Sequence, residues 1–426
     1  MAVGATSVAG TRRQLKRGGT GARLETPVIH GLLVLVTLAL VAFGLVMVYS
    51  ASSARAAISE GDPAYYLKRQ AIYALVGLVL FVLLARIGYR SLQRIAGPFL
   101  VVSLFLLALV LVAGTTVNGA KRWLELGPVT MQPSELAKLA LAVWVASFLA
   151  RRAAPTSLGS LVRPIGLVGG VAALLVLAEP DLGTAIAFAI VIGAIVLVSG
   201  TPLRVMVTAG TLAIGAVLLV SWVAPYRRAR LLTFLDPWAD PQGAGFQSVQ
   251  ALIALGSGGL FGVGLGESVQ KVYYLPEAST DMIFAIIGEE LGLFGTGAVI
   301  LAYVLFGYCG CRIALACRDP FGKRLAAGIT ALVCGQATVN LGAVLGIAPL
   351  TGIPLPFVSY GGSSLIVALA GVGILLNIAL TDAGERRASL RDRGRGDGGA
   401  RAAGPGRGGS AGGARRTREL RRAAST

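Results

Sequence analysis

The 426-residue chain is poor in charged, histidine and cysteine side chains. Charged residues make up 14% of it and apolar residues 55%, whereas soluble domains average about 25% charged residues. The single histidine, His30, lies at the start of an apolar run, which leaves no histidine-based metal site and no Ser/His/Asp triad to propose. This composition excludes an ordinary soluble domain and indicates a membrane protein.

The cysteines form no recognisable metal or redox motif. Their spacing fits neither CxxC nor an evenly spread disulfide framework. We interpret them as small apolar residues near the end of a membrane span. They are Cys309, Cys311, Cys317 and Cys334.

The net charge of +18 lies mostly in two short tails. Residues 1–27 carry five bases and one acid, and residues 382–426 carry twelve arginines and five acids. Because the tails account for most of the excess, the basicity does not indicate a nucleic-acid partner. Residues 382–426 are predicted to be a disordered Arg/Gly-rich tail that attracts anionic lipids, with partner binding as the alternative.

Ten apolar runs are long enough to cross a bilayer, which needs about 17–25 residues each. The sequence therefore predicts an all-α polytopic membrane domain over residues 28–381, preceded by a basic tail over 1–27. A large extracytoplasmic loop, 225–281, is expected between the seventh and eighth helices. The predicted spans are 28–50, 69–88, 96–114, 133–150, 164–178, 183–199, 203–224, 282–308, 325–347 and 357–380.

The distribution of bases sets the expected orientation. Eleven bases fall in the loops that ten spans would place inside, and five fall in the short loops that they would place outside. Both termini are therefore expected in the cytoplasm.

Two bases in the loop before the fourth span break this pattern. Lys121 and Arg122 lie on the outer side, where phospholipid headgroups or a substrate phosphate would be their anionic partner. Trp123 follows them and is either an interfacial anchor or a stacking surface for a sugar ring.

The fourth span begins with polar residues. Pro133 suits a first helical turn, so Glu135 and Lys138 fall on one helix face. An ionisable pair at membrane depth indicates a functional site, although a structural ion pair is the alternative. Gln132 and Ser134 stand beside the pair and join the same candidate site.

A third polar group, Glu179-Pro180-Asp181, separates two apolar spans. These carboxylates could cap the next helix, bind a cation or hold the basic groups of the first loop. The sequence leaves these alternatives open.

The large outer loop contains bases, a glycine-rich stretch and a terminal carboxylate. Its bases are Arg227, Arg228 and Arg230, and residues 256–266 are interpreted as flexible or re-entrant backbone that lines a cavity. Asp281 stands where the eighth span begins, as a helix cap or as a general base.

Two further features lie in and after the eighth span. Glu289 and Glu290 must point into the bundle or at basic partners. Ser359 and Gly361 are substrate-binding candidates, because they lie in a Pro- and Gly-rich segment before the last span that is expected to line a cavity.

Four co-linear motifs resemble the SEDS family (shape, elongation, division and sporulation). They are NGAKRWLELGPVTMQPSELAKL, AEPDLGTA, YLPEASTDMIFAIIGEELG and GIPLPFVSYGGSSL. The residues of the last two motifs resemble those of the division members more than those of the elongation members. One departure is visible, because Ser279 and Met282 flank Thr280-Asp281 where the family often has His and Phe.

The resemblance implies a peptidoglycan glycosyltransferase that polymerises lipid II at the outer face of the bacterial cytoplasmic membrane during cell division. It also implies a class B penicillin-binding protein and other division proteins as partners, and a septal location. It maps the family's essential aspartate onto Asp281, its loop tryptophan onto Trp123, and its Glu/Lys pair onto Glu135 and Lys138.

Inversion from an α-linked sugar pyrophosphate to a β-1,4 bond needs one base and no covalent intermediate. We assign the base to Asp281 and stabilisation of the pyrophosphate to Lys121 and Arg122, with the bases of residues 227–230 contributing. A divalent cation, Mg or Mn, could share that task near Asp281, Glu179 or Asp181, and no organic cofactor is expected. A lipid II flippase or transporter and a non-catalytic division scaffold are the alternatives.

Overall fold

The computed structural model describes residues 7–117, 120–127, 129–223, 225–272 and 274–399. Within these ranges, the side chains of residues 7–27, 117, 126, 129, 225–227 and 386–399 lie outside the description. The chain divides into two compact units, Met1–Asp382 and Ala383–Thr426.

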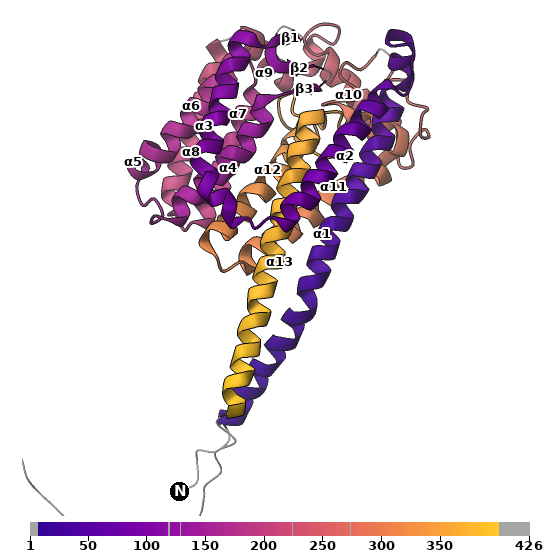
Figure 1. Ribbon diagram of the computed structural model, residues 1–426. Coiled ribbons are helices and arrows are strands. Elements are labelled where there is room, and N and C mark those ends of the chain that lie inside the picture. The colour runs from indigo at the N-terminus through magenta and orange to yellow at the C-terminus, as the bar shows by residue number, and fades with distance from the viewer. Residues whose placement is uncertain (1–6, 118–119, 128, 224, 273, 400–426) are drawn as a thin grey trace, which may run out of the picture. The chain divides into compact units, whose positions relative to one another are not determined.

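The first unit is a bundle of apolar helices (Figure 1). Nine helices in the described part of the chain are long and apolar enough to cross a membrane, and Leu182–Val198 is a shorter apolar helix. The all-α membrane fold is therefore confirmed. The helices are α1 Ser7–Ser59, α2 Tyr65–Arg86, α3 Arg90–Ala113, α4 Pro133–Ala150, α5 Leu158–Leu161, α6 Leu167–Ala178, α7 Leu182–Val198, α8 Leu203–Val223, α9 Pro225–Leu235, α10 Phe246–Ser257, α11 Ile283–Ala316, α12 Pro320–Val344 and α13 Gly362–Gly399.

Two short irregular helices complete this set. The π-helix Val162–Gly166 joins α5 to α6, so that Leu158–Ala178 forms one apolar stretch, and a 3-10 turn, Pro237–Ala239, lies between α9 and α10. The last helix begins at Gly362, later than the predicted 357, because residues 351–361 form an irregular segment. In the second unit α13 is helical as far as Gly399 where the composition predicted disorder, and residues 400–426 lie outside the described residues.

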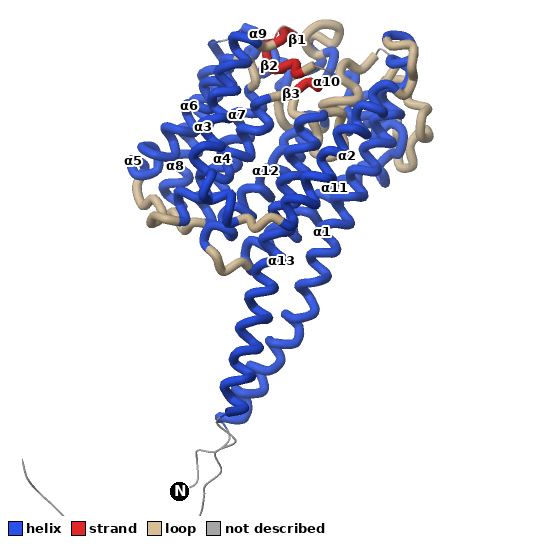
Figure 2. The backbone as a smooth tube through the Cα atoms, in the orientation of Figure 1, coloured by secondary structure: helices blue, strands red, loops and turns tan. Residues whose placement is uncertain are grey.

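A small antiparallel sheet, which the sequence analysis did not predict, stands between α3 and α4. It consists of β1 Thr115–Val117, β2 Ala120–Leu126 and β3 Val129–Met131, in the order β1-β2-β3. Lys121 pairs with Thr116, and Leu124 pairs with Met131. The sheet lies at the same end of the bundle as α9 and α10 (Figure 2), which we call the hairpin end.

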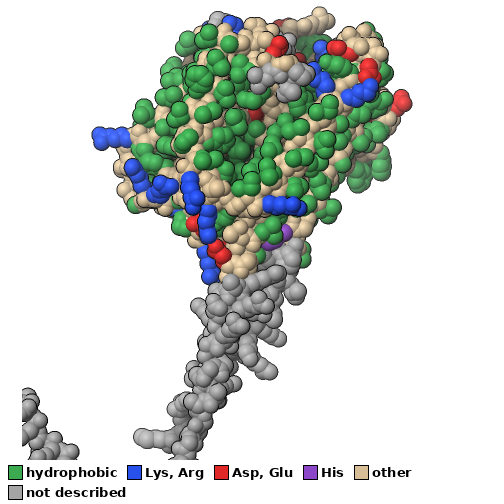
Figure 3. Space-filling view, viewed as in Figure 1, with side chains coloured by type: hydrophobic (Ala, Val, Ile, Leu, Met, Phe, Trp, Pro, Cys, Tyr) green, Lys and Arg blue, Asp and Glu red, His purple; other side chains and the backbone are tan. Residues whose placement is uncertain are grey.

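The core is built around α4 and α12. Helix α12 packs against α11, α7 and α4, while α3 packs against α4 and α1 packs against α11 and α2. In α4, 78% of the most apolar window is buried, compared with 6% in α8, so α4 is an interior helix and α8 a peripheral one. The apolar side chains of the outer helices cover much of the visible face, and Lys and Arg side chains gather at the end opposite the hairpin (Figure 3).

The glycine-rich stretch of the large outer loop lies against a break in α11. Gly292, with φ of 65° and ψ of −158°, interrupts the helix. The backbone N–H groups of Val263 and Gly264 donate to the carbonyls of Glu289 and Glu290 at 2.9 and 3.1 Å. A Cβ on Gly262 would lie 2.1 Å from the Glu290 carbonyl oxygen. Only glycine permits this approach, which satisfies carbonyls exposed by the helix break.

Candidate functional site

Asp281 lies at the hairpin end, two residues before α11 begins at Ile283. It belongs to a tight turn in which the N–H groups of Thr280 and Met282 donate to the Glu277 carbonyl at 3.1 and 3.2 Å. Glu277 has a positive φ of 55°, which is unusual for a residue other than glycine. The Thr280 hydroxyl donates to Glu277 Oε2 at 2.8 Å and lies 3.4 Å from Asp281 Oδ1. The turn therefore holds two carboxyl groups close together.

This environment changes the acidity of Asp281. Removal of the carboxyl group from water raises its pKa to about 7, the Glu277 carboxylate acts in the same direction, and the Arg230 guanidinium opposes both. A carboxylate with a pKa near neutrality can accept a proton from a hydroxyl group at physiological pH. The geometry and the pKa therefore suit Asp281 to general base catalysis.

The backbone around Asp281 is fastened to α12 and to the segment before α13. Asn340 Nδ2 donates to the carbonyls of Asp281 and Ile353 at 2.7 and 2.8 Å. The Ser359 hydroxyl donates to the Thr280 carbonyl at 2.5 Å. Ser359, which the sequence placed among the substrate-binding candidates, thus positions the turn of Asp281.

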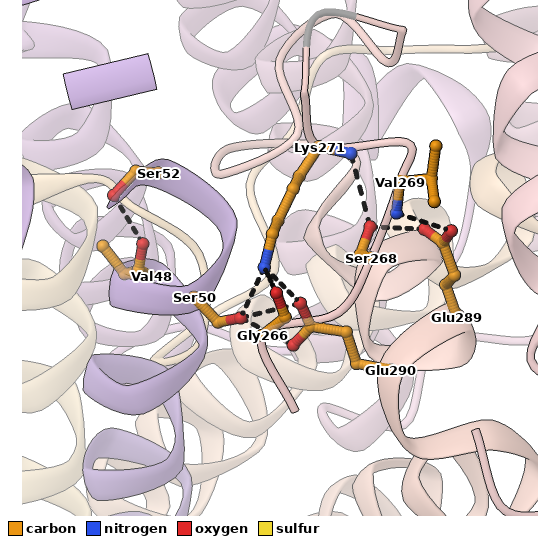
Figure 4. A network of polar contacts seen from close by, with 9 residues as sticks. All are labelled: Val48, Ser50, Ser52, Gly266, Ser268, Val269, Lys271, Glu289 and Glu290. Carbon is orange, nitrogen blue, oxygen red and sulfur yellow. Dashed lines mark hydrogen bonds and ion pairs between the residues drawn. The ribbon is translucent and has the colours of Figure 1, made fainter. Parts of the chain in front are cut away.

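The loop before Asp281 is anchored by two carboxylates of α11 (Figure 4). Lys271 Nζ lies 2.9 Å from Glu290 Oε1, and Ser50 of α1 donates to the same carboxylate at 2.7 Å. Glu289 accepts hydrogen bonds from the Ser268 hydroxyl and, at 3.0 Å, from the Val269 N–H. We expected these glutamates to point into the bundle or at basic partners. Glu290 has the basic partner Lys271, whereas the buried Glu289 is bound by polar groups of the loop.

Lys121 and Arg122, the two basic residues predicted on the outer side, lie on β2. Arg122 Nε and Nη2 donate to the backbone carbonyls of Glu179 and Pro180 at 2.9 and 2.5 Å. Lys121 is exposed and Trp123 is half-buried. One of the alternatives for the Glu179-Pro180-Asp181 group was that it holds a basic residue of the first loop. It does hold Arg122, through main-chain oxygens.

The two carboxylates of that group have different environments. Asp181 caps α7, because its oxygens accept from the Thr184 N–H at 3.0 Å and the Thr184 hydroxyl at 2.8 Å, and Gln132 Nε2 lies 3.5 Å away. The Glu179 side chain is fully buried, and neither of its oxygens has a hydrogen-bond partner in the described part of the chain. Burial raises its pKa to about 8, the neighbouring Asp181 carboxylate adds to this rise, and Arg122 opposes it.

The predicted pair at the start of α4 is present. Lys138 Nζ lies 2.8 Å from Glu135 Oε1, and both side chains are buried. The Ser134 hydroxyl is buried beside them and has no hydrogen-bond partner among the described residues. Gln132 connects this region to α13, since its N–H donates to the Ser363 hydroxyl at 3.0 Å.

The three arginines of the outer loop differ in their surroundings. The side chain of Arg227 lies outside the described residues, and Arg228 is exposed. Arg230 Nη1 lies 3.4 Å from the Leu350 carbonyl and borders a cavity of about 600 Å³ between α9, α10 and the end of α12. Of the two arginines whose side chains are described, Arg230 acts electrostatically on the Asp281 carboxyl group.

Gly361 was also a substrate-binding candidate. Its N–H donates to Gln70 Oε1 at 3.3 Å, and Gln70 Nε2 donates to the Ser359 carbonyl at 3.1 Å. The segment that carries Ser359 and Gly361 is therefore bound to α2.

A divalent cation finds only part of a site in the residues that the structure describes. They contain no group of three or more His, Cys, Asp or Glu side chains suited to a metal. The unpartnered oxygens of Glu179, close to Asp181, fit an ion that takes its other ligands from water and phosphate, as Mg²⁺ does.

Sequence reasoning missed three residues that shape this site. Glu277 lies four residues before Asp281 within the motif itself, so the paired carboxylates were visible in the spacing. Lys271 and Gln70 act across long sequence separations on Glu290 and Ser359, and no local pattern marks them.

Comparison with known proteins gives one consistent result. The family described as cell cycle protein, comprising FtsW, RodA and SpoVE, matches residues 30–383. A probable peptidoglycan glycosyltransferase FtsW of Geobacter sulfurreducens is 42% identical over 350 residues, which cover 82% of this chain and 94% of the relative. The stage V sporulation protein E of Bacillus subtilis is 40% identical over 352 residues, 82% of this chain and 96% of the relative.

A solved structure agrees with these relatives. It comes from work on the coordination of polymerization and crosslinking by a peptidoglycan synthase complex. The matching chain is 33% identical, has a TM-score of 0.67, and the match covers 82% of this chain and 96% of that one.

Proposed function

Because this chain belongs to the FtsW/RodA/SpoVE family of cell cycle proteins, we propose that it is a peptidoglycan glycosyltransferase that polymerises lipid II into β-1,4 glycan strands. The SEDS resemblance of the motifs is thereby confirmed. The observation that carries the catalytic assignment is the position of Asp281 at the hairpin end, where burial and the Glu277 carboxylate raise its pKa to about 7 against the opposing effect of Arg230.

In this mechanism Asp281 accepts the proton of the acceptor's 4-hydroxyl. The hydroxyl oxygen forms the bond to the donor's anomeric carbon, while the bond from that carbon to the pyrophosphate oxygen breaks. The configuration inverts in this single displacement, and the lipid pyrophosphate leaves with the electron pair. Glu277 assists by keeping the pKa of Asp281 high enough for the carboxylate to hold the proton.

The leaving pyrophosphate requires positive charge near the outer membrane face. Lys121 is exposed at the hairpin end, and Arg122 has two of its five N–H groups on main-chain carbonyls, so the others are available. A divalent cation, Mg²⁺ or Mn²⁺, would be held by Glu179 with Asp181 and would supply further charge neutralisation when bound.

The hairpin end faces the outside of the cytoplasmic membrane in this proposal, with both termini in the cytoplasm. The concentration of Lys and Arg side chains at the opposite end supports this orientation (Figure 3). A class B penicillin-binding protein and other division proteins are proposed as partners, and the division septum as the place of action. The peptidoglycan synthase complex supports the first of these partners.

The decisive experiment measures glycan strands formed from purified lipid II by the full-length protein with its penicillin-binding partner. Wild type is expected to polymerise, and Asp281→Asn to lose about 10²- to 10⁴-fold in rate, as removal of a general base does. Normal polymerisation by a folded Asp281→Asn variant contradicts the base assignment. Movement of lipid II across vesicles by wild type without any polymer contradicts the transferase and favours a flippase, and neither activity favours a scaffold.

A further inference from the structure

Arg69 is a base of α2 at the hairpin end that lacks an acidic partner. No carboxylate of the described residues lies within 4.0 Å of its guanidinium. Its Nη1 donates to the Tyr65 hydroxyl at 3.1 Å, and the guanidinium carbon lies 5.7 Å from the centre of the Tyr65 ring. Tyr73 and Tyr360 also interact with it electrostatically. Tyrosines therefore orient the guanidinium without neutralising it.

Three other bases at this end have carboxylate partners. Lys68, the preceding residue, lies 2.7 Å from Asp62, and Lys271 lies 2.9 Å from Glu290. Lys138 is paired with Glu135 in the same way, at 2.8 Å. The comparison marks Arg69 as a fixed positive charge that an external anion can approach.

A row of aromatic rings begins at Tyr65, which the Arg69 guanidinium contacts. The Tyr66 ring makes edge contacts with Tyr65 and Tyr360, with centroid distances of 5.3 and 5.1 Å and interplanar angles of 87° and 85°. All three tyrosines and Arg69 are partly exposed. We call Tyr65, Tyr66, Arg69 and Tyr360 the tyrosine–arginine cluster.

Hydrogen bonds join the cluster directly to the turn of Asp281. The N–H of Tyr360 donates to the Ser279 carbonyl at 2.8 Å. Gln70, the residue after Arg69, holds both sides of Tyr360 through Ser359 and Gly361. These hydrogen bonds connect the segment that carries Tyr360 both to α2 and to the turn of the proposed base.

We propose that the tyrosine–arginine cluster is a binding subsite for a phosphate group, with Arg69 as its ligand and the tyrosine rings in contact with the adjoining sugar or isoprenoid. A planar guanidinium binds phosphate oxygens through two parallel N–H donors, and aromatic faces bind sugar and hydrocarbon. Identification of the phosphate as that of the lipid-linked sugar substrate rests on the proposed function. A phospholipid headgroup is the other source of the same chemistry.

The test measures equilibrium binding to the full-length protein in nanodiscs of phosphatidylcholine. The probes are undecaprenyl pyrophosphate and, as the uncharged reference, undecaprenol. Arg69→Met is expected to weaken binding of the pyrophosphate at least about tenfold, because a charge-assisted hydrogen-bonded pair is lost, and to leave undecaprenol binding unchanged. Lys68→Met, which removes the neighbouring exposed charge, is the matched control and is expected to change the affinity less than about twofold.

Several outcomes overturn the subsite. The subsite is contradicted if Arg69→Met binds undecaprenyl pyrophosphate with wild-type affinity. It is also contradicted if Arg69→Met loses undecaprenol binding to the same extent, because that indicates damage to the fold. Arg69→Lys provides the second variant: it keeps the charge without the planar fork, so an intermediate affinity is expected. Displacement of the pyrophosphate by phosphatidylglycerol added to the nanodiscs assigns the cluster to phospholipid headgroups and overturns the substrate role.

This experiment involves no turnover, so its failure is distinct from failure of the proposed function. Pyrophosphate binding that depends on Arg69, in a protein that forms no polymer, supports the subsite and contradicts the transferase. Polymerisation with unchanged affinity in Arg69→Met contradicts the subsite alone.

Discussion

The side-chain amide of Asn340 donates a 2.7 Å hydrogen bond to the main-chain carbonyl of Asp281, and so connects the proposed base to the interior helix α12. The same nitrogen donates to Ile353 at 2.8 Å, which brings the segment before α13 to the same point. The orientation of Asp281 therefore depends on a residue 59 positions away in the sequence.

Replacement of Asn340 by Ala is expected to lower kcat for lipid II polymerisation about tenfold, with a smaller effect on KM. The reason is that two buried carbonyls lose their donor and the turn of Asp281 loses its support, at about 1–3 kcal/mol per unsatisfied group. Steady-state kinetics measure the effect. Thr338→Ala on the exposed side of α12 is the control, and an equal loss there would mean that α12 itself had been disturbed.

The pH dependence of polymerisation is expected to follow the deprotonation of Asp281. With a pKa of about 7, the single-turnover rate should rise about tenfold per pH unit below neutrality and level off above it. Glu277→Gln removes a neighbouring negative charge and should move the inflection to lower pH. Arg230→Met removes an opposing positive charge and should move it to higher pH. An inflection that neither substitution moves contradicts the assignment.

Asp281→Asn is expected to abolish polymerisation while raising the thermal unfolding temperature at pH 7. The folded pKa of about 7 lies above the ordinary value of 3.8, so the folded protein binds the proton more tightly than the unfolded chain. Stability therefore falls as pH rises from about 4 to about 7, and the neutral amide avoids this loss. Differential scanning fluorimetry should show a larger difference between variant and wild type at pH 7 than at pH 5.

Lys271→Met is expected to destabilise the folded protein by about 3 kcal/mol, because it leaves the fully buried carboxylate of Glu290 without its ion-pair partner. The double variant with Glu290→Gln should recover much of this loss, since both charges are then absent. Unfolding midpoints in detergent measure both effects. Lys68→Met, at an exposed ion pair, should change the midpoint little.

Mn²⁺ is expected to bind to the wild-type protein and to raise its unfolding temperature, because the ion displaces the proton of the buried Glu179 carboxyl group and gives its oxygens the partner that they lack among the described residues. Glu179→Gln should abolish the shift, and removal of the ion with a chelator should reverse it in wild type. Electron paramagnetic resonance of Mn²⁺ gives an independent count of bound ion. A full Mn²⁺ effect in Glu179→Gln excludes this location.

Local composition was sufficient to predict much of this protein. The fourth span, 133–150, coincides with α4, because Pro133 fixes a first turn and the apolar run ends at Arg151. The i,i+3 spacing predicted the contact between Glu135 and Lys138, since that spacing alone places two side chains on one helix face. The sheet β1–β3 escaped prediction because its strands are short and derive their stability from pairing with one another.

The sequence by itself determined the membrane fold and the family, and it singled out the carboxylate that we propose as the base, because apolar run length and co-linear motifs are properties of the chain. Only the tertiary structure decided how that carboxylate is tuned and held. Burial and Glu277 raise its pKa, Arg230 opposes them, and Asn340 and Ser359 fix its backbone. The tertiary structure also places Arg69 among tyrosines, because α2 and the segment before α13 lie next to each other. Electrostatic and hydrogen-bond energies depend on distance in space, and the residues concerned are brought together only by helix packing.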